Sequence, residues 1–263
     1  FMVDPGSKVR LDRIDPDECC DIEDRDAAGK ELARNLERLR DLQYRLYAEN
    51  RRAILIVLQA MDAGGKDGTI RHVIAAFNPQ SCHVTSFKVP STEEAAHDFL
   101  WRCHKEVPGK GKIGVFNRSH YEGVLVERVH DLVPRDVWSQ RYGQINMFEK
   151  ILAQNDTVIM KFYLHISRDE QRERLLKRIE DPDRRWKVSP NDLKERRYWK
   201  EYRTAFEAAL ERCSTEGAPW YIIPANRKWF RNLAVSHIVM ATMEEMSMRF
   251  PNPIIRSGKI SID

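Results

Sequence analysis

The spacing of hydrophobic positions changes along the chain and predicts where helices and strands lie. Leucines recur at steps of three and four over residues 27–50, which predicts a helix with one apolar face. The apolar run at residues 53–58 is too short for a typical helix and too continuous for a half-exposed strand. We therefore expect a strand that is buried on both faces, as in the centre of a parallel sheet.

Further short apolar segments alternate with helical patterns. The expected strands are residues 83–89, 112–116, 158–164 and 220–223, and the expected helices are residues 169–179, 192–210 and 228–248. Alternation of this kind after a buried first strand is typical of a parallel sheet with right-handed crossovers. We expect an α/β fold with a five-stranded parallel sheet flanked by helices.

The segment before the first predicted helix has a different composition. Residues 2–26 are rich in aspartate and glutamate and show little apolar periodicity. We expect an N-terminal arm at residues 1–26 that lies on the surface, followed by a single domain at residues 27–263.

The strongest chemical signal is the glycine-rich turn after the first predicted strand. Residues 59–69 read QAMDAGGKDGT and precede a helical pattern. Such a turn directs backbone N–H groups and the positive end of a helix at one point, and its lysine adds a point charge for phosphate. The general P-loop pattern is not met at Ala60, which replaces the first glycine, or at Asp67, which replaces the hydroxyl residue.

Two carboxylates, Asp62 and Asp67, lie in this turn and would repel a phosphate. A divalent cation would remove the repulsion, and Mg²⁺ prefers oxygen ligands together with substrate phosphates. We expect Mg²⁺, or Mn²⁺ in its place, with Asp62 as a ligand and with Asp67 and Thr69 as further candidates. For Asp67 the alternative is a carboxylate that stabilises the start of the helix.

A second polar cluster follows the third predicted strand. Residues 117–122 read NRSHYE and would lie at the carboxyl end of the sheet, where open α/β sheets bind ligands. Arg118 offers a planar fork for a phosphate, with a surface ion pair as the alternative. For His120 and Tyr121, ligand binding and packing are equally compatible with the pattern.

The positive charge of the chain is concentrated in one segment. Residues 168–203 contain 13 lysines and arginines and 9 aspartates and glutamates, an excess that equals the net charge of +4 of the whole chain. Within it, residues 181–192 contain two prolines, a tryptophan and several cations. We expect a basic lid at about residues 180–195 that closes over phosphates. The alternative is a solvated charged surface.

Composition excludes several other classes of protein. No run approaches the ~18 apolar residues of a membrane span, and the acidic N-terminal stretch lacks the apolar core of a secretory signal, so we expect no membrane partner and a cytoplasmic location. Five cysteines without C-x-x-C spacing indicate neither a disulfide framework nor a zinc site. The pI of about 8.8 and the lack of an aromatic and basic strip argue against a nucleic-acid partner.

Together these motifs resemble the polyphosphate kinase 2 family, class III. Residues 61–69 are similar to the family's variant Walker A motif, and residues 116–122 to its Walker B block, where Asn117 is typical of the subgroup that accepts AMP as well as ADP. Residues 87–90, 97–101, 161–167 and 226–232 match further family blocks. One departure is Gly123, where the subgroup commonly has aspartate.

The resemblance implies a fold similar to thymidylate kinase and a metal-dependent transfer of phosphoryl groups from inorganic polyphosphate to AMP and ADP. In this interpretation Asp62 holds the metal, while Lys66 and Arg118 grip the transferred group. The implied nucleotide and phosphate ligands are Ala63, Gly64, Gly65, Lys66, Asp67, Gly68, Thr69, Asn117, Arg118, Glu122 and Arg128, and the implied polyphosphate ligands of the lid are Arg184, Arg185 and Lys187.

Two alternative functions remain open at this point. An ATP-dependent nucleoside monophosphate kinase would use a similar sheet with a different phosphate donor, and a P-loop nucleic-acid-binding ATPase would explain the basic segment in another way. The expected partners are polyphosphate and adenine nucleotides, with guanine nucleotides as a further candidate. We expect a homodimer or a homotetramer.

Overall fold

The computed structural model describes residues 1–20, 22, 24–188 and 190–253. Its strands form one sheet in the order β2-β3-β1-β4-β5, and every neighbouring pair is parallel. The strands are β1 (Ala53–Ala60), β2 (Cys82–Ser86), β3 (Ile113–Asn117), β4 (Thr157–His165) and β5 (Trp220–Pro224). The predicted five-stranded parallel α/β fold is confirmed.

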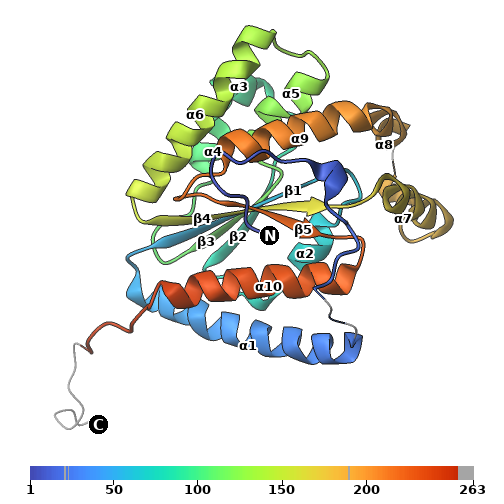
Figure 1. The fold of residues 1–263 in the computed structure, drawn as a ribbon. Helices are drawn as coiled ribbons and strands as arrows, with labels where there is room; N and C mark the ends of the chain where they lie inside the picture. The colour runs from blue at the N-terminus through green and yellow to red at the C-terminus, as the bar shows by residue number, and fades with distance from the viewer. Residues whose placement is uncertain (21, 23, 189, 254–263) are drawn as a thin grey trace.

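Helices cover both faces of this sheet (Figure 1). On one face α1 packs against α10, and on the other α6 packs against α9. The α-helices are α1 (Arg25–Glu49), α2 (Lys66–His72), α3 (Thr92–Ala95), α4 (Trp101–Lys105), α5 (Val126–Val129), α6 (Arg135–Gln154), α7 (Arg168–Glu180), α8 (Pro190–Glu195), α9 (Trp199–Cys213) and α10 (Lys228–Glu245). Short 3-10 helices include η2 (Ile74–Ala76), η3 (His120–Val124) and η5 (Arg196–Tyr198).

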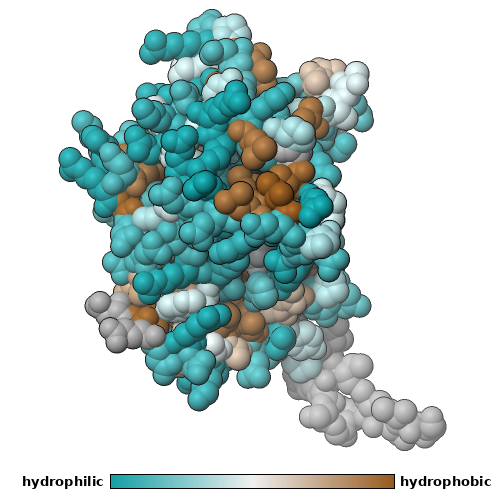
Figure 2. All heavy atoms as spheres, turned by 90° about the vertical axis from the view of Figure 1, so that its right-hand side faces the viewer, coloured by the Kyte–Doolittle hydropathy of each residue, from teal (hydrophilic) through white to brown (hydrophobic). Residues whose placement is uncertain are grey.

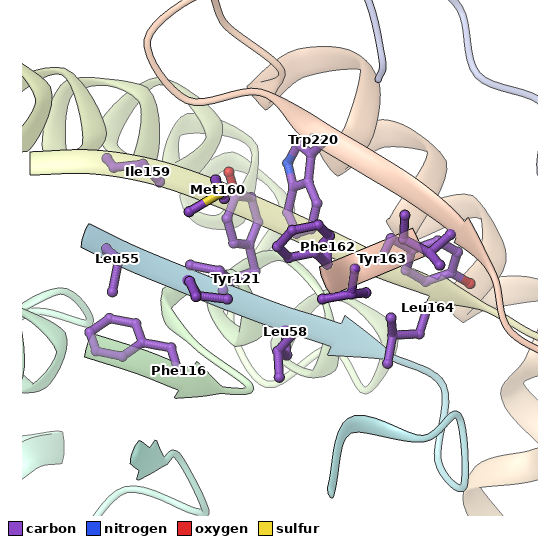
Figure 3. Packing of buried hydrophobic residues seen from close by; sticks show 14 of the residues in the cluster. Leu55, Leu58, Phe116, Tyr121, Ile159, Met160, Phe162, Tyr163, Leu164 and Trp220 are labelled. Carbon is purple, nitrogen blue, oxygen red and sulfur yellow. The ribbon is translucent and has the colours of Figure 1, made fainter. Parts of the chain in front are cut away.

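The first strand is central because its side chains are apolar on both faces. All eight residues of β1 are buried, and the strand pairs with β3 on one side and β4 on the other. Figure 3 shows Leu55 and Leu58 of this strand packed among aromatic side chains such as Phe116 and Phe162. The interpretation of residues 53–58 as a strand buried on both faces is confirmed.

Several predicted boundaries differ from the structure; the helix expected at residues 228–248, for example, ends at Glu245. The strand expected at residues 83–89 ends at Ser86, because β2 is at the edge of the sheet and its neighbour β3 ends opposite it at Asn117. The helix expected at residues 192–210 is instead divided into α8, η5 and α9, and its last part continues to Cys213.

The prediction that the N-terminal segment lies only on the surface is wrong for its apolar residues. Val3, Val9 and Leu11 are buried and belong to the core. Met2 forms an antiparallel bridge with Tyr221, so this segment covers β5, which would otherwise be an open edge of the sheet. The apolar residues are too few and too irregular to show a period, which explains why the pattern did not reveal them. The division between an arm and a domain at residue 26 stays a prediction.

The membrane prediction rested on the lack of a long apolar run. Among the residues that the structure describes, no helix combines the length and the apolar character needed to cross a bilayer.

Candidate active site

The phosphate loop connects β1 to α2 and depends on two glycines. A Cβ on Gly64 would lie 2.5 Å from the Cβ of Ala60 and 2.7 Å from the carbonyl oxygen of Met61. Gly65 has φ of 111°, a left-handed conformation that side chains disfavour. The loop can therefore turn this tightly only because both positions lack a side chain.

Lys66 begins α2 and reaches back across the loop. Its Nζ donates to the carbonyl oxygen of Ala60 at 3.1 Å, and the side chain is largely buried. Burial, and then the charge of Arg118, lower the pKa of Lys66 to about 8, although nearby carboxylates oppose this shift. Lys66 therefore stays mostly charged at neutral pH and loses its charge as the pH rises through about 8.

Two polar contacts join the loop to the end of β3. Nη2 of Arg118 lies 2.8 Å from Oδ1 of Asp62, and Nδ2 of Asn117 donates to Oδ1 of Asp67 at 3.0 Å. Arg118 has φ of 61° and its N–H donates to the carbonyl oxygen of Leu58, which turns the chain sharply at the strand end. The structure therefore brings the predicted residues of the two motifs into direct contact.

Glu122 extends this polar group along η3. Its Oε1 accepts from Nε2 of Gln59 at 3.1 Å, and Gln59 also contacts Ser119. Burial raises the pKa of Glu122, while the charge of Arg118 opposes the shift. Gln59 was part of the predicted turn at residues 59–69 but was not selected as a site residue, although a glutamine directly after the apolar run at residues 53–58 was the signal available.

Two cavities meet at the ion pair of Asp62 and Arg118. The first, here called the loop cavity, has a volume of about 560 Å³, and the second, the side cavity, has about 210 Å³. Both are lined by Asp62, Val89, Arg118 and Asp192. The loop cavity is otherwise lined by residues 63–68, 86–88, 117 and 178, and the side cavity by residues 59–61, 122, 125, 126, 171, 191, 195, 196, 199, 202 and 206.

The surroundings of the loop are mostly polar. Figure 2 shows the side of the molecule toward which the strands run, where hydrophilic side chains surround a smaller hydrophobic patch. Such a surface suits ligands that combine charged phosphates with an apolar ring. The side cavity has this mixed character, because Glu122 and Arg196 share it with Trp199 and Phe206.

The structure does not bring every predicted residue to the loop. Arg128 donates to the hydroxyl of Tyr142 at 2.9 Å and lies over the ring of Trp138, and it is not among the residues that line either cavity. Thr69 is fully buried, its hydroxyl donates to the carbonyl oxygen of Gly65, and it is not among the residues that line either cavity. Neither residue has the surroundings expected of a phosphate or metal ligand.

The predicted lid cations also have other contacts in this structure. Arg184 pairs with Asp181 at 3.1 Å, Nε of Arg185 donates to the carbonyl oxygen of Ile179, and Lys187 lies over the ring of Trp186. These cations do not line the loop cavity in the described chain. Their role as polyphosphate ligands stays a prediction.

Other cations of the chain line the cavities, and the sequence reasoning did not select them. Arg178 and Lys88 line the loop cavity, and Arg196 lines the side cavity. Arg178 and Arg196 lie within the basic segment at residues 168–203, but its charge pattern does not distinguish them from their neighbours.

Gly123 is buried beside α6 rather than at the loop. A Cβ here would lie 2.8 Å from the ring of Phe99 and 3.0 Å from Nη1 of Arg141. Arg141 donates to the carbonyl oxygen of Gly123 and to Glu127 at 2.6 Å. The carboxylate that the subgroup commonly carries at this position would therefore approach Arg141, whose charge Glu127 balances in this chain.

The loop carboxylates fit a metal that is shared with a phosphate ligand. Among the described residues, no group of three or more histidines, cysteines, aspartates or glutamates is arranged to hold a metal ion by itself. Mg²⁺ commonly takes one or two carboxylates together with substrate phosphates and water. Asp62 and Asp67 both line the loop cavity, so their oxygens suit such a cation.

A buried ionic network lies behind the site. Nζ of Lys161 contacts Oε2 of Glu149 at 2.6 Å and the hydroxyl of Tyr121 at 2.9 Å, and His120 lies 3.0 Å from the other carboxylate oxygen. Burial acts to raise the pKa of Glu149, but the charge of Lys161 and the hydrogen bond with His120 outweigh it and keep this pKa below its usual value. His120 and Tyr121 therefore pack in the core and do not face either cavity.

Comparisons with known proteins agree with the fold and the loop. The sequence profile described as Polyphosphate kinase 2 matches residues 22–251. A protein of Meiothermus ruber is 51% identical over 100% of this chain and 99% of its own length, and one of Rhodopseudomonas palustris is 46% identical over 95% and 91%. The crystal structure of polyphosphate kinase 2 from Arthrobacter aurescens has a TM-score of 0.93 at 41% identity and covers 95% of this chain and 90% of that one. The resemblance seen in the motifs is confirmed, and the chain belongs to the polyphosphate kinase 2 family.

Proposed function

We propose that this protein is a kinase that transfers phosphoryl groups from inorganic polyphosphate to AMP and ADP, forming ADP and ATP. The observation that carries this proposal is the 51% identity, over the full length of both chains, to a relative named AMP/ADP-polyphosphate phosphotransferase. The Rhodopseudomonas palustris relative is named ADP-polyphosphate phosphotransferase. Both names specify polyphosphate as the partner of an adenine nucleotide.

The geometry of the site supports the transfer of a phosphoryl group between two ligands. Phosphoryl transfer needs little covalent help, so the protein acts mainly by positioning and by neutralising charge. Arg118 and Asp62 line both cavities, and Lys66 supplies further positive charge in the loop cavity. We propose that the donor and acceptor phosphates meet at this point, in line with one another.

The metal requirement belongs to the same proposal. Bound Mg²⁺, or Mn²⁺ in its place, would supply further neutralisation of phosphate charge, with Asp62 as its protein ligand and Asp67 beside it. Removal of divalent cations with EDTA is expected to abolish transfer, and added Mg²⁺ to restore it. Full activity in excess EDTA would contradict the metal assignment.

One assay separates the proposed function from its first rival. AMP, ADP and GDP are each incubated with polyphosphate and Mg²⁺ in the absence of ATP, and the products are separated by charge. We expect ADP and ATP from AMP, and ATP from ADP, while GTP would add guanine nucleotides to the acceptors. Product formation from AMP only when ATP replaces polyphosphate would instead indicate an ATP-dependent nucleoside monophosphate kinase.

We also propose that the protein forms a homodimer or a homotetramer. The outer face of α1 supports this, since Tyr44 and Tyr47 are 65% and 55% exposed. Multi-angle light scattering after size-exclusion chromatography measures the mass directly. A mass equal to one chain at micromolar concentration would contradict the proposal.

A further inference from the structure

Arg231 lies directly beneath the phosphate loop. It belongs to the first turn of α10 and only 2% of its surface is exposed. A Cβ on Gly65 would overlap with Nη1 of Arg231, and one on Gly68 would lie 2.9 Å from Nη2. Only the backbone of the loop therefore separates this guanidinium from the loop cavity, which Gly65 and Gly68 line on their other side.

No carboxylate in the described part of the chain balances this buried cation. Nε and Nη2 of Arg231 donate to the neutral amide oxygen of Asn232, at 3.1 and 2.7 Å. Among the described residues Arg231 forms no ion pair, and Arg174 and Lys228, which interact with its charge, are cations as well. Burial and the charge of Arg174 lower the pKa of Arg231 to about 10, which leaves it positively charged at neutral pH.

Arg174, unlike Arg231, has a carboxylate partner. It pairs with Glu170 at 2.6 Å, and its Nη1 donates to the carbonyl oxygen of Ala63 in the loop at 3.0 Å. Two buried guanidiniums thus support the loop from below, but only one of them has a carboxylate. An isolated buried charge is strongly unfavourable, so the folded protein without ligand carries an uncompensated electrostatic cost at this point.

We propose that Arg231 is a positioning residue that gives the phosphate loop a fixed positive charge from behind, and that the phosphates bound in the loop cavity are its counter-charge. This inference rests on the proposed function, because it takes the loop to bind phosphate. Charges interact more strongly in a buried, poorly solvated region than in water, so Arg231 can act through the loop backbone without contacting the ligand. It also fixes the loop sterically, since the guanidinium occupies the space below both glycines.

Charge and packing can be separated by three variants. Arg231→Met keeps an unbranched chain of similar length and removes the charge, while Arg231→Lys keeps the charge and changes the shape. Arg231→Gln is a second neutral variant in case methionine prevents folding. Arg52→Met is the matched control, because Arg52 is paired with Glu49 and precedes β1, at the opposite end of the strand from the loop.

The experiment measures binding of tripolyphosphate with Mg²⁺ by calorimetry and the melting temperature of each ligand-free protein. For Arg231→Met we expect affinity to fall at least tenfold, with a melting temperature equal to or above that of the wild type. Arg231→Lys should recover most of the affinity. Arg52→Met should melt at a lower temperature and bind with unchanged affinity.

Steady-state kinetics give a second readout. The neutral variants are expected to raise the KM for polyphosphate more than they lower kcat. Wild-type affinity in the neutral variants, or equal losses in the lysine and methionine variants, would overturn the proposal and leave Arg231 a packing residue. If the wild-type protein neither binds tripolyphosphate nor turns over polyphosphate, the proposed function itself fails.

Discussion

Asp62 and Arg118 form an ion pair at the point where the loop cavity and the side cavity meet. Asp62 is only partly exposed, at 25% of its side chain, and it accepts from Arg118 through one carboxylate oxygen, Oδ1. Among the described residues, Oδ2 accepts no hydrogen bond from the protein. The same side chain can therefore hold the arginine in place and offer an oxygen to a cation.

Asp62→Asn tests this double role. The amide keeps the shape but loses the negative charge, so we expect turnover to fall by about a hundredfold or more, as when a group that stabilises transition-state charge is removed. The fold should persist, because a partly exposed ion pair contributes only ~1 kcal/mol or less to stability. Turnover measured beside the circular dichroism melting curve checks both statements, and near-normal turnover would refute the metal assignment.

The lowered pKa of Lys66 gives a pH dependence with a definite sign. Lysine is charged below its pKa, so the free enzyme loses this charge as the pH rises through about 8. We expect kcat/KM for polyphosphate to fall across the same range. Lys66→Arg, which keeps its charge, should have a flat profile between about pH 7 and 9. A flat profile for the wild type would show that Lys66 does not titrate there.

At the scale of elements, the turn that follows β3 is packed against α6. Gly123 in η3 has no space for a side chain, because Phe99 and Arg141 occupy the position where its Cβ would lie. By contrast, Gly143 lies on the exposed face of α6, and a Cβ there would meet no atom within 4 Å. The space that a side chain would need is therefore filled at Gly123 and empty at Gly143.

This contrast predicts opposite effects of the same substitution. Gly123→Ala would force the ring of Phe99 aside and is expected to destabilise the protein by about 1–3 kcal/mol. Gly143→Ala should stabilise it by roughly 0.5–1 kcal/mol, since alanine is the better helix former. Urea denaturation of both variants measures the difference. Equal stability of the two would mean that the turn relaxes without cost.

At the scale of the whole molecule, the network around Glu149 joins segments that are far apart in sequence. Lys161 in β4 contacts Glu149 in α6, Tyr121 in η3 and the carbonyl oxygen of Cys213 at the end of α9. All three side chains that meet here are almost completely buried. The network therefore joins the polar segment after β3 to β4 and to the helix layer formed by α6 and α9.

Glu149→Gln would leave the charge of Lys161 buried without its carboxylate. We expect a loss of about 3–5 kcal/mol in the free energy of unfolding, as is typical when one partner of a buried pair is removed. The double variant Glu149→Leu with Lys161→Met should recover much of this, because both charges are then absent. Urea denaturation measures both variants, and a single variant as stable as the wild type would contradict the charged state of the pair.

The sequence by itself determined the class of the fold and the position of the phosphate loop. Both depend on local patterns: the apolar run at residues 53–58 can only be buried on both faces, and the glycines beside Lys66 mark a tight turn that binds anions. The resemblance to the family was equally accessible, because it depends on short motifs in order along the chain.

Only the tertiary structure decided which residues meet. Asp62 and Arg118 are 56 positions apart in sequence and come together because β1 and β3 are neighbours in the sheet. Arg231 is far from the loop along the chain, and α10 alone places it below Gly65. Hydrophobic periodicity indicates which face of an element is buried but not what lies against that face. For this reason the order of the strands and the position of Arg231 beneath the loop could be seen only in the folded chain.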